Sequence, residues 1–175
     1  SAGNVNATQA QLIVAEGLSL SASQVVVNDA GLIQAKQLQL SAHDLSNVGG
    51  SIVHTGVTEL NITLAGTLDN TAGTLASHAN NMSLSADTLL NTDGKIEHSG
   101  SVGPFVSGGL LSLQASTLNG QRGHILSTAA LRLRGGSINL DSASTAAVVP
   151  AHLTSLTEIW ILRKRALACG TTIRV

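Results

Sequence analysis

Apolar residues alternate with polar residues along most of this chain, in short runs that are interrupted at regular intervals. Within the stretch 82–98, Met82, Leu84 and Ala86 alternate with serine and aspartate. Asn91 and Gly94 follow, and the alternation then resumes. Alternation with a period of two, bounded by Asn and Gly, is typical of a half-buried strand, a tight turn and a second strand.

The same pattern recurs along the chain. Units begin at residues 18, 38, 60, 82, 111 and 131, so they are separated by 20, 22, 22, 29 and 20 residues. A period of this length indicates a solenoid in which each unit forms one coil. In the first full unit, Val25 is expected at the position of Leu45, with one extra residue at the corner. In the partial unit before it, Ile13 is expected at the position of Ile33. The longest unit contains an insertion at 99–109, whose proline and glycines predict a surface loop.

Two other repeat folds share parts of this spacing. Seven-residue spacings such as Leu38–Leu45–Ile52 allow a heptad, but every second or third helical turn would then contain a Gly and an Asn. Each of these residues costs a helix about 0.5–1 kcal/mol. The longer consensus of leucine-rich repeats is not met either. The pattern therefore predicts an all-β chain that forms a parallel β-helix, with coils of about 20–22 residues.

In such a β-helix, equivalent residues of successive coils stack about 4.8 Å apart and form columns. Stacked Asn amides can hydrogen-bond to the copies above and below them. The Gly three residues after each Asn is expected to adopt a backbone angle that other residues resist. The expected structural columns contain Leu38, Leu60, Met82 and Leu111 in the interior, and Asn28, Asn47, Asn70 and Asn91 at a corner.

Composition fits stacked layers of small aliphatic side chains, since 43% of residues are hydrophobic and only 1% are aromatic. The net charge is −1, divided into −4 for residues 1–145 and +3 for residues 146–175. The sequence has no basic stripe for nucleic acid and no apolar run of about 18 residues that would span a membrane. The only cysteine is Cys169, which excludes an internal disulfide but not secretion. The chain begins mid-pattern without a signal peptide, as expected for an interior piece of a longer protein.

These features divide the chain into a repeat region, 1–145, and a tail, 146–175, that lacks the repeat. Two interpretations of the tail are open. Rough helical spacing, which favours a short helix that caps the stack, is shared by Leu153, Leu156, Trp160 and Leu167. Alternatively, the tail is sequence foreign to the repeat region.

The unit L-x-L-x-A-x-x-L-x-N-x-x-G-x-I, complete in Leu38–Ile52 and repeated with Met first in Met82–Ile96, resembles the filamentous haemagglutinin repeat. The resemblance covers about residues 10–145. It implies a right-handed β-helix in the shaft of a large exoprotein, exported by an outer-membrane partner and displayed on the bacterial surface. It also implies adhesion to host or neighbouring cells. A passive stalk of a contact-dependent growth inhibition toxin is the alternative, and a polysaccharide-cleaving β-helix enzyme is a third.

Candidate chemistry is sparse, and we expect neither an enzyme nor a cofactor. His54 and His98 share one repeat position two coils apart, too far for a common metal ion, and are expected to be exposed polar residues. The carboxylates near the Asn corner, Asp29, Asp69 and Asp93, do not share a register position. This offset favours solvated charges over a catalytic pair.

Three features of the sequence could support binding. The loop residues Pro104 and Phe105 are the expected place of any specific contact. Arg122, Arg132 and Arg134 could hold an anionic glycan, although a solvated face is the simpler interpretation. The open ends of the stack favour end-to-end self-association.

Overall fold

The computed structural model describes residues 2–100, 109–147 and 151–155. Every regular element in these ranges is a β-strand, and the paired strands are parallel. The strands are β1 (Ala2–Asn6), β2 (Gln11–Val27), β3 (Leu32–Ser41), β4 (Asp44–Ser46), β5 (Ser51–His54), β6 (Leu60–Thr63), β7 (Thr67–Asp69), β8 (Thr74–Ser77), β9 (Asn81–Leu90), β10 (Lys95–His98), β11 (Leu110–Asn119), β12 (His124–Ser127), β13 (Ala130–Asn139), β14 (Ser144–Ala147) and β15 (Ala151–Ser155). The prediction of a parallel β-helix is confirmed.

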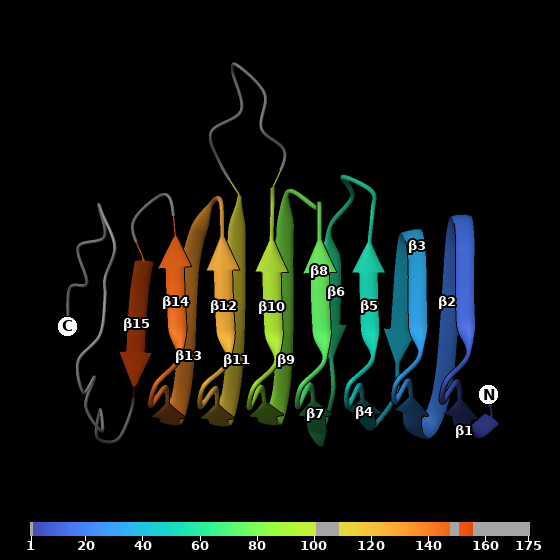
Figure 1. The fold of residues 1–175 in the computed structure, drawn as a ribbon, viewed down its shortest axis with the longest axis horizontal. Helices are drawn as coiled ribbons and strands as arrows, with labels where there is room; N and C mark the ends of the chain where they lie inside the picture. The colour runs from blue at the N-terminus through green and yellow to red at the C-terminus, as the bar shows by residue number, and fades with distance from the viewer. Residues whose placement is uncertain (1, 101–108, 148–150, 156–175) are drawn as a thin grey trace.

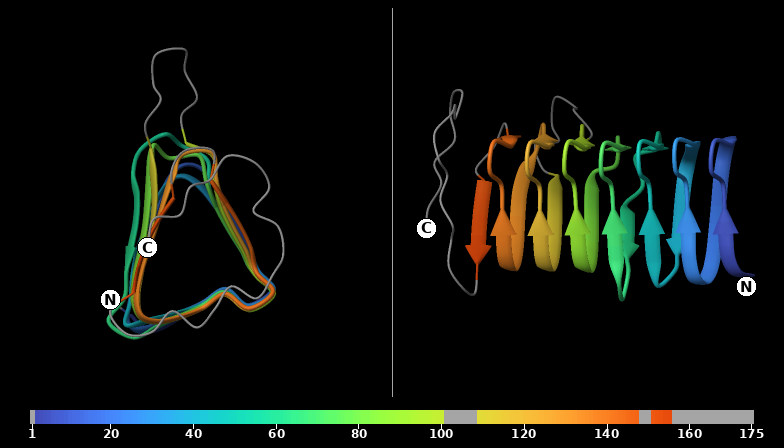
Figure 2. Two further views of the ribbon diagram at one scale, coloured as in Figure 1. Left: turned by 90° about the vertical axis from the view of Figure 1, so that its left-hand side faces the viewer. Right: turned by 60° about the horizontal axis from the view of Figure 1, so that its bottom comes forward.

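Successive coils lie side by side along one axis (Figure 1). Seen along that axis, they nearly superimpose and outline a triangle (Figure 2). In the fourth coil, β9 forms the first two sides and the short strand β10 forms the third. The corner between the second and third sides contains the Asn and Gly of the repeat.

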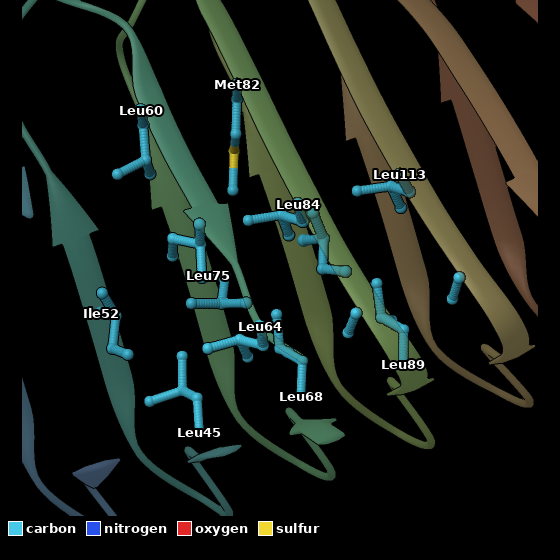
Figure 3. Close-up of a cluster of buried hydrophobic side chains, with 14 of the residues drawn as sticks. Leu45, Ile52, Leu60, Leu64, Leu68, Leu75, Met82, Leu84, Leu89 and Leu113 are labelled. Atoms are coloured by element: carbon cyan, nitrogen blue, oxygen red, sulfur yellow. The ribbon is translucent and has the colours of Figure 1, made fainter. Parts of the chain in front are cut away.

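The alternation of the sequence becomes the division between inside and outside. Along β9, Met82, Leu84 and Ala86 are buried, while Ser83 and Ser85 between them are less covered. Because the coils stack in register, each buried residue meets its equivalent in the next coil. One side contains the paired residues Leu60, Met82, Leu111 and Leu131, and another contains Ile33, Ile52, Leu75, Ile96 and Ile125. The resulting core is a continuous rod of aliphatic side chains (Figure 3).

The register of the first coil differs from the prediction at two places. Val26, not Val25, pairs with Leu45 and is fully buried, because the extra residue of this coil lies before the second side rather than at the corner. Leu12, not Ile13, pairs with Ile33, and Ile13 is 60% exposed. A bulge between Val14 and Gly17 shifts the register there.

The solenoid also continues beyond the predicted boundary at residue 145. Strand β14 runs to Ala147, and β15 pairs in register with β13, so that Leu153 lies opposite Leu133. The helix predicted to include Leu153 is therefore wrong at this residue. Leu156, Trp160, Leu167 and the cysteine lie outside the described residues. Within the described ranges, no helix is long and apolar enough to cross a membrane.

Candidate functional site

The column of asparagines at the corner is the main polar structure inside the rod. Asn28, Asn47, Asn70 and Asn91 are all fully buried. The side-chain amide of each of the first three donates from Nδ2 to Oδ1 of the next, at 2.7, 2.7 and 2.6 Å. The same amide nitrogen also approaches backbone carbonyls, for example those of Gly73 and Lys95 for Asn70. One asparagine side chain therefore forms hydrogen bonds both within its own turn and to the coil that follows.

This ladder ends where the repeat departs from its consensus. Gly120 replaces the next Asn, and within the described part of the chain the Asn91 amide donates only to the carbonyls of Gly94 and His124. At the other end Ala7 occupies the equivalent corner position and is itself buried. As a result, Oδ1 of Asn28 is buried without a hydrogen-bond partner among the described residues.

The corner glycine has a different role from the one predicted. The left-handed backbone angle occurs one residue earlier, as at Ala72 (φ 54°) and Asp93 (φ 55°). The glycine is required by space instead. A Cβ on Gly73 would lie well inside contact distance of the Asn47 carbonyl oxygen, and one on Gly94 would meet that of Asn70 in the same way. Where a coil stacks on a ladder asparagine, as at Gly50, Gly73 and Gly94, the turn packs too closely on that asparagine for a side chain at the glycine position.

A second buried polar column lies at the end of the third side. His54, Ser77, His98 and Ser127 occupy equivalent positions in β5, β8, β10 and β12, and we call them the His–Ser column. The two histidines are 0% and 2% exposed, so the expectation that they are exposed is wrong. The alternation that buries Ile52 and Ile96 also buries the residue two positions later. Because His54 and His98 follow Ile52 and Ile96 by two residues, the alternation alone could have predicted their burial.

Hydrogen bonds define the state of the His–Ser column. Nε2 of His98 lies 2.9 Å from the carbonyl oxygen of Ala79, and its Nδ1 lies 3.0 Å from the hydroxyl of Ser127. His54 contacts the hydroxyls of Ser77 and Thr58 at 3.2 and 3.4 Å. Burial lowers the pKa of both histidines below the usual histidine value. Burial therefore favours the neutral form of both rings.

The carboxylates near the corner make separate local contacts. Asp29 accepts hydrogen bonds from the Ser46 hydroxyl and the Val48 amide. Asp69 accepts one from the amide of Thr71, two residues later. Asp93 forms a two-point ion pair with Arg122, at 2.6 and 2.8 Å, and the hydrogen bonds from Arg122 lower the pKa of its carboxyl. In the parts of the chain that the structure describes, no group of three His, Cys, Asp or Glu could hold a metal ion.

The predicted binding residues lie in different places. Arg122 is at the Asn corner and is engaged by Asp93, whereas Arg132 and Arg134 project from the outward face of β13. Anion binding by the arginines stays a prediction. The loop residues Pro104 and Phe105 lie outside the described residues.

The fold and its Asn ladder define a parallel β-solenoid whose equivalent residues stack in columns, the architecture of a repeat shaft. The haemagglutinin repeat family matches residues 1–72, 63–103 and 106–155, and this chain belongs to that family. It is also 31% identical, over 147 residues, to a protein of Yersinia pestis named Toxin CdiA. That match covers 83% of this chain but only 4% of the relative. No solved structure matches the chain.

The ladder predicts a large cost for removing one amide. The Asn70→Ala variant should lower the free energy of unfolding by about 2–4 kcal/mol, because it leaves the side-chain oxygen Oδ1 of Asn91 buried without its donor and removes all the hydrogen bonds of the Asn70 amide. Ser83→Ala, on the outward face of the neighbouring coil, should change it by less than about 0.5 kcal/mol. Urea denaturation followed by circular dichroism measures both. Equal effects for the two variants would show that the ladder adds no stability.

The unpartnered oxygen of Asn28 predicts a stabilising change. Ala7→Asn should extend the ladder by one member and raise the free energy of unfolding by about 1 kcal/mol, because its amide can donate to that oxygen. Ala7→Leu is the matched control, with similar bulk and no donor. A gain for Leu as large as that for Asn would attribute the effect to packing rather than to the hydrogen bond.

Proposed function

We propose that this chain is a segment of the shaft of a secreted, filamentous surface protein, and that its lateral faces take part in attachment to other cells. The unbroken stacking of coils from β1 to β15 carries this proposal. Membership of the haemagglutinin repeat family supports it. The role is mechanical: the coils set the reach of the parent protein from the cell surface.

The direction of the backbone hydrogen bonds supports a rod that resists extension. Bonds between coils run along the axis, as in those from Ser51 N to Gly31 O, from Thr74 N to Gly50 O and from Lys95 N to Gly73 O, at 2.7–2.8 Å. Pulling on the ends therefore loads many such bonds together with the aliphatic columns. Each coil adds about 4.8 Å of length.

The lateral surface is suited to weak, repeated contacts. On the first side, the outward residues of neighbouring coils pair as columns of small polar side chains. They are Asn61, Ser83 and Ser112 in one column and Thr63, Ser85 and Gln114 in another, followed by Arg132 and Arg134. Individually weak contacts to a glycan or protein receptor would add up by multivalency along such a surface.

A second candidate is a passive stalk in a contact-dependent growth inhibition toxin. The similarity to Toxin CdiA favours it. In that role the rod supplies reach alone, and other parts of the parent protein act on the target cell. Both candidates require an outer-membrane secretion partner for the parent protein, and both allow end-to-end association of isolated segments through open strand edges.

The shaft proposal predicts that length grows in units of one coil. Duplication of residues 38–81, which contain two coils, should lengthen the particle by about 10 Å with an unchanged cross-section. Small-angle X-ray scattering measures the maximum dimension and the cross-sectional radius separately. An increase in the cross-section without added length would contradict stacking and the shaft role.

The two candidates differ in what the isolated chain does on a cell surface. If the lateral faces are adhesive, beads coated with the chain should bind host or neighbouring bacterial cells, and the duplicated form should bind more strongly. Arg132→Ala with Arg134→Ala is the matched variant that tests the charged end of the face. Binding no greater than that of uncoated beads would reject the adhesive role and leave the passive stalk.

A further inference from the structure

The His–Ser column contains the only ionisable side chains among the buried polar residues of the described structure. The Asn ladder is built from amides, which do not change charge with pH. His54 and His98 can each take up a proton in an interior that holds them neutral. The two columns therefore respond differently to acid.

The hydrogen bonds of His98 define one tautomer. The carbonyl of Ala79 can only accept, so the ring donates to it from Nε2. Because the neutral ring then carries no hydrogen on Nδ1, this nitrogen accepts from the hydroxyl of Ser127, whose oxygen in turn accepts from the amide of Ala129 at 3.0 Å. Every donor and acceptor in this chain of contacts is matched while the ring is neutral.

Protonation breaks this match. With a hydrogen on Nδ1, the Ser127 oxygen faces two donors, and its own hydrogen loses its acceptor. The new positive charge also lies in the interior, where an unpaired charge is strongly disfavoured. A charge on His54 would be buried in the same way, beside the Ser77 hydroxyl that accepts from the Ala79 amide.

Among the described residues, no carboxylate hydrogen-bonds to either ring, and so none offsets the charge. On the elements around His98, the ionisable side chains are Lys95 and Glu97 of β10, His124 of β12 and His78 after β8. Lys95, His78 and His124 are exposed, and Glu97 alternates to the opposite face of its strand. Near His54, the carboxylates of Glu16 and Glu59 are engaged elsewhere, by Lys36 and by the Asn81 amide. The nearby His78 lowers the pKa of His54, so it opposes the charged form rather than stabilising it.

The His–Ser column also lies beside the two ends of the insertion that follows His98. A Cβ on Gly100 would lie 3.3 Å from the His98 ring, so Gly100 packs directly on it. Gly109, at the other end, packs against the carbonyl of Asn80 and the side chain of Ala129. These belong to the two turns that the column holds, through the Ala79 carbonyl and the Ala129 amide. The column therefore holds the base of the insertion in place.

We propose that the His–Ser column is a proton-sensitive switch: the neutral column holds the turns at 78–80, 99–100 and 128–129 together, and protonation in mildly acidic surroundings loosens them. The Asn corner, on another edge of the triangle, stays intact. The rod thereby keeps its length while the base of the insertion gains freedom.

The sign of the pH dependence follows from the burial of the rings. An unfolded chain takes up protons on its histidines near pH 6.5, whereas the pKa of each buried ring is lower. The stabilising contribution is complete above about pH 6.5 and declines as the pH falls toward the pKa in the folded protein. Within that window each histidine changes the opening equilibrium by up to about tenfold per pH unit.

Histidine NMR on the intact chain tests the first step. Long-range proton–nitrogen spectra should show His98 as the Nε2–H tautomer at pH 7.5 and should show it titrating below the usual histidine pKa of about 6.5. An Nδ1–H tautomer at pH 7.5, or a titration midpoint at or above about 6.5, would overturn the proposal.

Amide hydrogen exchange, corrected for the intrinsic effect of pH, tests the second step. Between pH 6.5 and pH 5.0, protection at Ala79 and Ala129 should fall by up to about tenfold per pH unit, while protection at Gly73 and Gly94 in the Asn corner stays constant. A uniform change at both corners, or none at either, would reject a local switch.

A substitution at His98 tests whether this residue causes the acid response. His98→Ser places in the column the residue that positions 77 and 127 already hold, and it should remove the acid-induced loss of protection at Ala129. His124→Asn, on the exposed face of β12, is the control and should behave as the unchanged protein. An undiminished acid response in a folded His98→Ser variant would refute the proposal. If that variant does not fold, the tautomer and the exchange pattern of the unchanged protein decide it.

Discussion

The register between successive coils is the constraint on which the rest of this structure depends. Parallel pairing places each residue directly above its equivalent, so an inward position must suit the coil below, the coil above and the interior together. Insertions are consequently confined to the bends and corners, as at Gly66 and in 99–109, where the ladder of backbone bonds can restart. The absence of side chains at Gly50, Gly73 and Gly94 has the same origin, since the corner stacks at backbone contact.

The interior contains two polar columns that solve the problem of buried hydrogen-bonding groups in different ways. Stacked amides such as Asn47 and Asn70 donate along the axis and accept from the coil before, so the ladder is neutral at every pH and complete except at its ends. The His–Ser column alternates two residue types and depends on a particular tautomer of His98. Its hydrogen bonds therefore depend on the protonation of a side chain, whereas those of the Asn ladder do not. It lies next to the insertion at 99–109, the longest in the repeat region.

A solenoid of this kind distributes its stability among neighbouring coils, because each coil contacts only the next. That property suits a shaft, whose length can change by whole coils without a new core. It also makes local changes tolerable: an orphaned acceptor at Asn28 or a glycine at position 120 ends one column without interrupting the aliphatic columns beside it. The same independence lets one corner respond to pH while another does not.

The alternation of residues, their period and the recurring Asn and Gly were enough to predict strands, coils and the columns of Leu and Asn. They were not enough to predict which residues of each strand face inward. Alternation says which residues share a side of a strand, but a bulge or an extra residue at a bend reverses that assignment, and only pairing with the next coil decides it. Val26 is therefore buried instead of Val25, and Leu12, which is partly buried, packs against the core instead of Ile13. The left-handed angle at Ala72, the strand at Ala151–Ser155 and the burial of His54 and His98 were likewise decided by stacking, because each depends on contacts between coils that are distant in sequence.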